Sequence, residues 1–244
     1  MTCVVVGAST GLGRALAEAL ARRGQALLLV SSDERDLVPL AADLMATQGI
    51  EARTLAHDAA DHAGLAAAID AALAKDEPID GLLFPIGTSD DADDLFLPPD
   101  RAEELVRINL LAVTSVVSRM LPRMLARHRG AIVGFGSVAA ERGRGRNVLY
   151  AAAKRGLMSV FESLRHRLEG EGIAVVLYTL GYVDTNLAFG RPLPFRKADP
   201  RRLAERVCDD LGRARGKRFL PGFWRLVSFA VRSLPWFVYR RMRF

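Results

Sequence analysis

Tyr150 and Lys154 have the types and spacing of a proton-transfer pair. They are four residues apart, so a helix through this segment places the phenol and the ammonium on one face. A nearby cation favours the ionised phenol, which makes proton exchange feasible near neutral pH. Any helix can carry such a pair at its surface. However, only 4 of the 34 lysine and arginine residues are lysines, so a lysine here indicates a need for a compact ammonium with a tunable pKa.

Ser137 supplies a hydroxyl that fits the same chemistry. It ends the sequence Gly-Phe-Gly-Ser, directly after a predicted strand over 130–136. Open parallel sheets bind their ligands at the carboxyl ends of the strands. The sequence therefore predicts that Ser137 holds a substrate carbonyl beside the Tyr150 phenol.

A glycine-rich turn occupies residues 7–13, between the first predicted strand and the first predicted helix. Its sequence, Gly-Ala-Ser-Thr-Gly-Leu-Gly, lets the backbone approach a pyrophosphate and presents amide N–H groups and a helix N-terminus to it. Tight turns also use glycine for conformational reasons alone. Because this turn joins a strand directly to a helix, we predict that it binds a dinucleotide.

Alternating strand-like and helix-like segments predict the elements that position these groups. The strand-like segments are apolar runs without polar alternation, which is typical of strands buried on both faces of a parallel sheet. We predict an α/β fold, a single Rossmann-type doubly wound parallel sheet of about seven strands with helices on both faces. The strand-like segments are 3–6, 26–30, 51–56, 80–86, 130–136 and 173–179. The helix-like segments are 12–23, 34–48, 61–74, 100–128, 148–170 and 200–213.

The C-terminal part of the chain differs in composition from the rest. Residues 191–244 contain 15 Lys or Arg and 4 Asp or Glu, whereas the remainder contains 19 and 24. We predict one cofactor-binding and catalytic domain over 1–220, a loop at 190–194, and an amphipathic, aromatic and basic extension over 221–244. In that extension Arg225, Ser228 and Arg232 form one polar stripe at helical spacing.

Two interpretations of the extension remain open. Basic residues with Trp and Phe on an amphipathic segment fit the surface of an anionic membrane, through contact at 222–244. The same residues fit packing on the domain itself or on a second subunit. No motif that reads or stacks on bases accompanies the charge, so we expect no nucleic-acid partner.

Composition excludes several other classes of protein. Of the 244 residues, 50% are hydrophobic and 25% are charged, which suits one large globular domain. Two cysteines and four histidines without ligand spacing exclude a disulfide scaffold and predict no metal site. We see no long apolar run and no export signal, so we expect a cytoplasmic protein, at most peripheral at the inner face of the membrane.

These motifs, in this order and at these distances, resemble the short-chain dehydrogenase/reductase family over about residues 2–220. The resemblance implies an NAD(P)-dependent oxidoreductase that moves a hydride between a nicotinamide and a carbonyl or alcohol carbon. It also implies a homodimer or homotetramer that pairs the fourth and fifth helices. The chain departs from the family at 84–87, which reads Phe-Pro-Ile-Gly where Asn-Asn-Ala-Gly is usual, and at 180–181, which reads Leu-Gly where Pro-Gly is usual.

The resemblance implies a role for each site residue. Tyr150 is the general acid in reduction, Lys154 lowers its pKa and binds the nicotinamide ribose, and Ser137 polarises the carbonyl. Asn109 holds a water of the proton relay, or else only satisfies local backbone. The residues implied to bind the cofactor are Gly7, Ser9, Thr10, Gly11, Leu12, Gly13, Ser32, Asp33, Asp58, Ala59, Gly87, Tyr150, Lys154, Gly181, Val183 and Thr185.

The choice between NAD and NADP stays open. At the end of the second strand an acid favours a free ribose 2′-hydroxyl and an arginine favours a 2′-phosphate, but positions 31 and 32 are both serine. Asp33 either reaches the ribose or caps the next helix. Asp58 either meets the adenine or serves only as a turn or cap residue.

Residues 137–147, 150–154 and 221–225 are similar to the branch of the family that contains decaprenylphosphoryl-2-keto-ribose reductase. This resemblance implies a keto-sugar on a polyprenyl phosphate as substrate, in cell-envelope polysaccharide synthesis. Arg142, Arg144 and Arg146 then meet the phosphate, unless they form only a solvated basic loop. Two alternatives are a soluble reductase of small ketones or acyl substrates and a dinucleotide sensor without turnover, which would need only the glycine turn.

Overall fold

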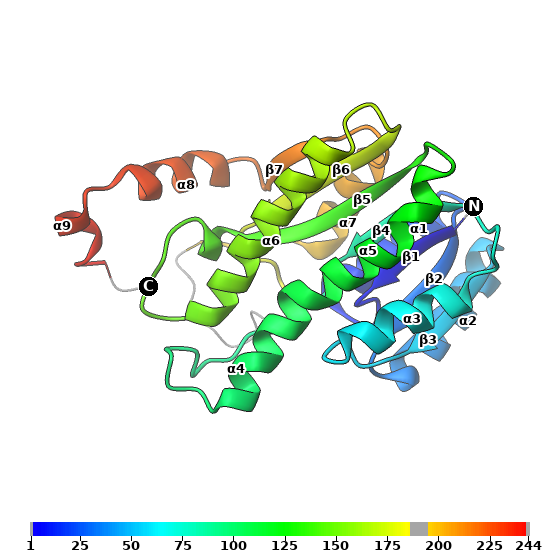
Figure 1. Ribbon diagram of the computed structural model, residues 1–244, viewed down its shortest axis with the longest axis horizontal. Coiled ribbons are helices and arrows are strands. Elements are labelled where there is room, and N and C mark those ends of the chain that lie inside the picture. Colours follow the sequence, from blue (N-terminus) through cyan, green and yellow to red (C-terminus); the bar gives the residue numbers. More distant parts are fainter. Residues whose placement is uncertain (1, 186–194, 243–244) are drawn as a thin grey trace.

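Seven parallel strands form one sheet in the computed structural model, which describes residues 2–185 and 195–242 (Figure 1). They are β1 (Thr2–Val6), β2 (Ala26–Ser31), β3 (Ala52–Ala56), β4 (Ile79–Phe84), β5 (Gly130–Ser137), β6 (Ile173–Leu180) and β7 (Gly216–Leu220). Their order is β3-β2-β1-β4-β5-β6-β7, so the winding changes direction between β1 and β4. The predicted doubly wound α/β fold is confirmed. The predicted loop at 190–194 lies outside the described residues.

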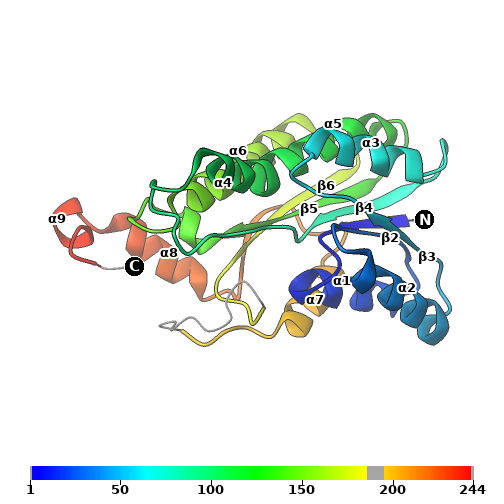
Figure 2. The ribbon, with the colours of Figure 1, turned by 90° about the horizontal axis from the view of Figure 1, so that it is seen from below.

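Helices cover both faces of the sheet (Figure 2). One face carries α1 (Gly11–Ala21), α2 (Glu34–Gln48) and α7 (Pro200–Asp209). The other carries α3 (His62–Ala72), α5 (Ala112–Leu125) and α6 (Val148–Arg167). The remaining elements are α4 (Pro99–Val106), the π-helical turn η1 (Arg107–Leu111) that continues α4 into α5, the short 3-10 turn η2 (Val138–Ala140), α8 (Trp224–Ser233) and α9 (Trp236–Tyr239).

The strands have no polar alternation because each side of the sheet has its own core. In β1, Cys3 and Val5 enter the core beneath α1, α2 and α7. Val4 and Val6 enter the core beneath α3, α5 and α6. Successive side chains of a strand point to opposite faces, so a strand covered on both faces must be apolar throughout.

Strand β7 was absent from the predicted strand segments. Its sequence, Gly-Lys-Arg-Phe-Leu, contains two charged residues, yet it pairs in parallel with β6. As the last strand of the sheet it leaves Lys217 and Arg218 exposed. A search for uniformly apolar runs therefore misses it, because edge strands tolerate and even favour charge.

The predicted polar stripe of the C-terminal extension is wrong in one respect. Ser228 is buried against the domain, whereas Arg225 and Arg232 are exposed. The large apolar side chains Leu226 and Phe229 are 73% and 71% exposed. Helix α8 therefore presents much of its apolar surface away from the protein, which is the reverse of an ordinary surface helix.

Among the described residues, one continuous helix, over Pro99–Leu125, has the length and composition expected of a membrane-crossing helix. Six residues of its α5 part are buried in the core beneath α3, α5 and α6. Core helices of water-soluble domains meet the same criteria, so we assign this helix to the core of the domain.

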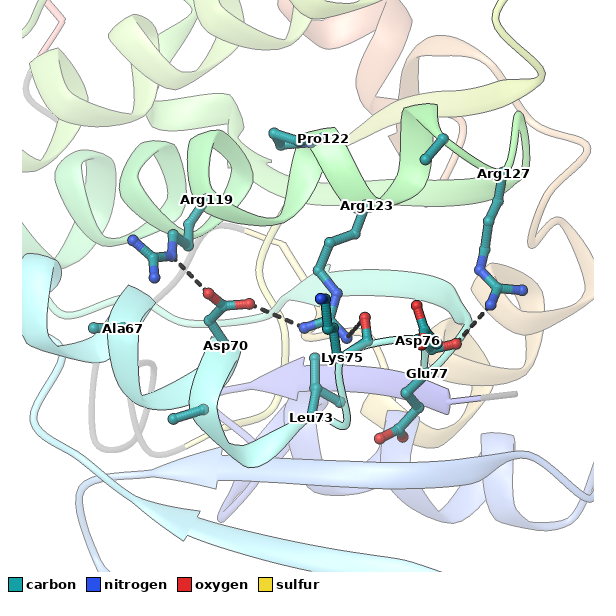
Figure 3. Close-up of a pocket in the computed structure, with 12 residues that line it drawn as sticks. Ala67, Asp70, Leu73, Lys75, Asp76, Glu77, Arg119, Pro122, Arg123 and Arg127 are labelled. Carbon is teal, nitrogen blue, oxygen red and sulfur yellow. Dashed lines mark hydrogen bonds and ion pairs between the residues drawn. The ribbon is translucent and has the colours of Figure 1, made fainter.

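A surface cavity of about 650 Å³ lies between α3 and α5, next to the chain segment that enters β4 (Figure 3). Arg119 and Arg123 share the carboxylate of Asp70, with N–O distances of 2.8 and 2.9 Å. Arg123 also donates to the carbonyl oxygens of Ala74 and Lys75. Both arginines thus join α5 to α3, and Arg123 also joins α5 to the segment before β4. This cavity lies at the amino edge of the sheet, whereas the predicted site lies at the carboxyl edge.

Arg123→Met is expected to lower the free energy of unfolding by about 1–3 kcal/mol, because two backbone carbonyls and one carboxylate oxygen lose their donor. Urea denaturation monitored by circular dichroism measures the change. Arg127→Met is the matched control, since Arg127 is exposed and, within the described part of the chain, donates to a single carbonyl, that of Asp76, at 2.6 Å. Equal losses for the two variants would contradict the structural role of Arg123.

Candidate active site

The predicted site residues gather at the carboxyl edge of the sheet. Gly7 follows β1 and Gly87 follows β4, the strands between which the winding changes direction. A Cβ atom built on Gly7 would lie 2.9 Å from Cα of Ile86, so these two segments are in contact. Ser137 ends β5 and Gly181 follows β6 at the same edge. Open α/β sheets bind ligands at such a point.

The glycine turn has the geometry of a diphosphate cradle. Gly7 and Gly11 have φ angles of +95° and +54°, which glycine adopts without steric cost. A Cβ on Gly13 would lie 1.8 Å from the carbonyl oxygen of Gly7, so α1 approaches β1 too closely for any other residue. Thr10 precedes α1 and makes no side-chain cap bond to it. The N–H groups of the first turn are therefore not capped by Thr10 and suit an anionic group.

The other residues of this turn contact the neighbouring strands. The hydroxyl of Ser9 accepts a hydrogen bond from Ser31, at 2.9 Å. Leu12 is buried in the core beneath α1. A Cβ on Gly11 would lie 2.8 Å from Cγ2 of Thr185, so the segment after β6 lies directly over the glycine turn. The turn therefore contacts both the end of β2 and the segment after β6.

Asp33 caps a helix at the end of β2. Its carboxylate accepts the backbone N–H of Arg35 at 2.9 Å and pairs with the guanidinium at 2.7 Å. The hydrogen bond from the Arg35 side chain holds the pKa of Asp33 below its ordinary value. Of the two roles left open for Asp33, the structure shows the cap. Ser32, beside it, is exposed.

Asp58 occupies the turn after β3. Its carboxylate accepts the backbone N–H of Ala60 at 2.9 Å, which is a local turn interaction. The side chain is exposed at the carboxyl edge, and the neighbouring Ala59 is buried. Of the two roles left open for Asp58, the structure shows the turn role.

Lys154 is the buried cation of the site. It is 3% exposed, and its Nζ donates to the carbonyl oxygens of Ile86 and Phe135, each at 3.2 Å. These two bonds join the chain after β4 to β5. Burial lowers the pKa of Lys154 from 10.5 to about 8. The ammonium is thus charged at neutral pH but gives up its proton more readily than an exposed lysine does.

Asn109 faces Lys154 across Gly87. It is fully buried in η1, and its Nδ2 donates to the carbonyl oxygens of Thr88 and Leu105, at 2.7 and 2.9 Å. Its Oδ1 has no hydrogen-bond partner among the described residues. A Cβ on Gly87 would lie 3.0 Å from this Oδ1 and 3.2 Å from Nζ of Lys154. An acceptor without a partner beside a buried ammonium fits a water molecule or a ligand hydroxyl.

Tyr150 lies near the start of α6, and Ser137 is the last residue of β5. Tyr150 lies in the first turn of α6, one helical turn before Lys154. The hydroxyl of Ser137 accepts the backbone N–H of Ala139 at 3.1 Å, which fixes it at the start of η2. Both side chains are half-buried.

Asp93 is a site residue that the sequence analysis missed. It is 1% exposed, and its two carboxylate oxygens accept the N–H groups of Leu149 and Tyr150, each at 2.9 Å. Asn147, the residue before α6, has φ of +51° and supplies no side-chain cap. A carboxylate from a distant loop therefore caps the helix and positions Tyr150. Asp93 is one of four aspartates within 90–94, and nothing in the sequence distinguishes it from the others.

Gly181 makes room for a tryptophan of the C-terminal extension. A Cβ on Gly181 would lie 1.8 Å from Nε1 of Trp224, which is itself 4% exposed. The indole also meets the Tyr182 ring edge-on, with 5.4 Å between centroids. Val183 follows, nearly buried, and forms an isolated parallel bridge with Ala198. The extension thus reaches the segment predicted to contact the nicotinamide.

Comparison with known proteins agrees with this geometry. The family model described as short chain dehydrogenase matches residues 1–191. An uncharacterized oxidoreductase of Myxococcus xanthus is 31% identical over 80% of this chain and 77% of its own length. An uncharacterized oxidoreductase of Mycobacterium tuberculosis is 29% identical over 98% of this chain and 96% of its own.

A solved structure and an enzyme of known activity extend the comparison. A short-chain dehydrogenase from Sphingobium yanoikuyae, solved in complex with NADPH, is 26% identical, covers 100% of this chain and 96% of its own, and superposes with a TM-score of 0.84. A 3-oxoacyl-[acyl-carrier-protein] reductase of Escherichia coli is 27% identical over 75% of this chain and 74% of its own. Together with the match of the family model, these similarities show that the chain belongs to the short-chain dehydrogenase family of NAD(P)-dependent oxidoreductases.

Proposed function

We propose that this protein reduces a ketone with NADH or NADPH and uses Tyr150 as the general acid. The observation that carries the proposal is the buried ammonium of Lys154, one helical turn from the phenol and opposite the unpaired Oδ1 of Asn109. A protein that merely sensed a dinucleotide would need the glycine turn but not a buried charge. Burial of an unpaired charge is costly, so its presence favours catalysis.

Carbonyl reduction needs a hydride at carbon and a proton at oxygen. A bound nicotinamide dinucleotide supplies the hydride, and the protein supplies positioning and the proton. The hydroxyl of Tyr150 donates the proton to the carbonyl oxygen, and the hydroxyl of Ser137 donates a hydrogen bond to the same oxygen. Lys154 stabilises the phenolate that remains. Asn109 holds through Oδ1 the water that returns a proton from solvent.

The cofactor lies, in this proposal, across the crevice between β1 and β4. The glycine turn with Ser9, Thr10 and Leu12 holds the diphosphate, and the residues that follow β2 and β3 flank the adenosine. Gly87, Val183 and Thr185 flank the nicotinamide, with Gly181 acting through the Trp224 contact. We propose the catalytic and cofactor-binding unit to be 1–220 and the extension to be 221–244.

The favoured substrate is a keto-sugar carried on a polyprenyl phosphate, at the inner face of the membrane. The half-buried Arg144 supports it, since its Nε has no partner among the described residues and the side chain lies between Ser137 and Tyr150 in sequence. Arg146 is exposed in the same segment. Arg142 does not fit the phosphate role expected for it, because it donates to the carbonyl oxygens of two residues of the extension.

A second candidate substrate is a small ketone or an acyl chain without a lipid-linked sugar. The E. coli relative, a 3-oxoacyl-[acyl-carrier-protein] reductase, favours it. The two candidates share the proton-transfer step at Tyr150 and differ only in what lies beyond the reacting carbonyl. A panel that contains both substrate classes therefore separates them.

Peripheral membrane contact through 222–244 is part of the first proposal. Residues 211–244 contain nine Lys or Arg and no Asp or Glu. The described part of the extension exposes Leu226, Phe229, Trp236 and Phe237. A positive, aromatic and apolar surface of this kind suits an anionic bilayer. A second copy of the chain is less suited, because a symmetric contact would bring like charges together.

We also propose a homodimer or homotetramer formed through the helix over Pro99–Leu125 and α6, which correspond to the fourth and fifth predicted helices. The most apolar window of the helix over Pro99–Leu125 is only 39% buried within the chain. An apolar helix face left partly uncovered supports subunit contact at this face.

Tyr150→Phe is expected to lower kcat/KM for ketone reduction by roughly 10²–10⁴-fold, the usual contribution of a general acid. NAD(P)H consumption with a panel of ketones measures it, and titration of cofactor fluorescence is expected to give an affinity within about twofold of the parent. Tyr178→Phe is the control, since that phenol bonds Asp210 on the α7 side of the sheet. Equal activity of parent and Tyr150→Phe would refute the proposed function.

Lys154→Met is expected to remove a pH dependence of stability. Burial lowers the pKa of Lys154 from 10.5 in the unfolded chain to about 8. Between these values the unfolded chain binds more protons, so the free energy of unfolding rises with pH. From about pH 7 to about pH 10 the parent is expected to gain roughly 2–3 kcal/mol relative to Lys154→Met. Urea denaturation of the parent and of Lys154→Met at both pH values measures this gain. If the difference in free energy of unfolding between the two proteins is the same at both pH values, the prediction is contradicted.

Full-length protein is expected to float with vesicles that contain an anionic phospholipid. Replacement of Trp236 and Phe237 by serine removes two exposed aromatic side chains and is expected to weaken binding at least about tenfold. Phe96→Ser is the matched control, because Phe96 is 90% exposed on the loop before α4. Equal flotation of the double variant and the parent, or no flotation of the parent, would contradict the membrane contact.

A further inference from the structure

The C-terminal extension rests on two segments that border the active site, and both are held by specific contacts. One attachment is the packing of Trp224 on Gly181, just after β6. The other joins residues 231–239 of the extension to residues 141–143, within the catalytic loop, which we define as residues 138–149 between Ser137 and Tyr150. In Figures 1 and 2 the extension lies beyond the carboxyl edge of the sheet, beside this loop.

Arg142 connects the catalytic loop to the end of α8. Its NH1 donates to the carbonyl oxygens of Val231 and Leu234, at 2.7 and 2.6 Å. Helix C-terminal carbonyls are acceptors without partners inside the helix, so a guanidinium there satisfies them and opposes the negative end of the helix dipole. The same guanidinium lies over the ring of Tyr239, 3.9 Å from its centroid. The hydroxyl of Tyr239 donates to the carbonyl oxygen of Gly143, at 2.7 Å.

Glu141 is the buried carboxylate of this contact. Only 1% of its side chain is exposed. Its Oε1 accepts from Nζ of Lys217 on β7, and its Oε2 lies 3.6 Å from NH1 of Arg232 on α8 without a hydrogen bond. Its backbone carbonyl accepts from Arg155, the residue after Lys154. A buried carboxylate is stable only when it is paired, so Glu141 holds β7, α8 and α6 to one point of the catalytic loop.

Two glycines of the catalytic loop lie in open space. A Cβ built on Gly143 or Gly145 would meet no atom within 4 Å. The loop separates the Ser137 hydroxyl from the Tyr150 phenol, and the relative placement of these two groups decides how a carbonyl oxygen is held. A misplacement of about 1 Å in such a site lowers the rate by up to about 10²-fold.

We propose that Glu141 and Arg142 are positioning residues, and that through them the C-terminal extension sets the relative placement of Ser137 and Tyr150. This inference rests on the proposed ketone reduction at Tyr150. In this inference the extension helps to position the catalytic groups, in addition to the proposed contact with the membrane. Glu141 and Arg142 follow β5, whereas the glycine turn proposed to hold the diphosphate follows β1.

Full-length Glu141→Gln and Arg142→Met test the inference, with NADPH and the best ketone of the panel. Each is expected to lower kcat by roughly ten- to hundredfold and to raise the KM for the ketone, with the dissociation constant for NADPH within about twofold of the parent. The primary isotope effect with 4-deuterated NADPH is expected to rise, because a misplaced acid makes the chemical step more rate-limiting. A smaller folded fraction would instead lower kcat and the number of NADPH sites together and would leave KM and the isotope effect unchanged.

Two control variants and one variant with a smaller structural change test whether the kinetic effects come from the contact between the extension and the catalytic loop. Glu162→Gln and Arg167→Met change exposed residues of α6 and are expected to have parental kinetics. Tyr239→Phe removes the hydroxyl that donates to Gly143 and keeps the ring beneath Arg142, so it is expected to fold and to show a smaller change in the same direction. Parental KM and isotope effect in all three loop and extension variants would overturn the inference. Failure of the proposed function is distinguishable, because it would show as equal activity of the parent and Tyr150→Phe.

Discussion

Burial of the Lys154 ammonium is the constraint on which the rest of the site depends. A cation removed from water needs acceptors, and here these are two backbone carbonyls, one from β5 and one from the chain after β4. The sheet must therefore hold these strands in register, and a Cβ at residue 87 would crowd both Oδ1 of Asn109 and Nζ of Lys154. The buried ammonium of Lys154 lowers the free energy of unfolding, and such a cost in stability is common at functional sites.

The fold and the main chemical groups could be predicted because their signals are local. A glycine turn joins a strand to a helix within seven residues, and the Tyr150–Lys154 spacing falls on one helix face. Alternating apolar runs predict a parallel sheet because both faces are covered. Strand β7 could not be predicted in this way, because a strand at the edge of the sheet can carry the charges of Lys217 and Arg218.

The contacts that position the chemical groups could not be predicted, because they join residues far apart in the chain. Asp93 caps α6 across more than fifty residues, and it stands among similar aspartates. Trp224 explains a glycine at 181 that the family resemblance assigned to the cofactor. Arg142, expected to meet a phosphate, satisfies the carbonyls at the end of α8 instead. Each depends on where separate elements meet, and sequence periodicity carries no information about that.

The orientation of α8 bears on both the proposed membrane contact and the proposed positioning of Ser137 and Tyr150. Its buried side carries Trp224 and Ser228, and its exposed side carries Leu226 and Phe229. The Ser228 hydroxyl has no hydrogen-bond partner among the described residues, so a simple gain in packing does not explain why this side faces inward. The orientation becomes reasonable if the exposed side meets an apolar surface while Arg142 and Glu141 hold the end of the helix to the catalytic loop. One short segment would then determine both where the enzyme meets its substrate and how Ser137 and Tyr150 are placed for the reaction.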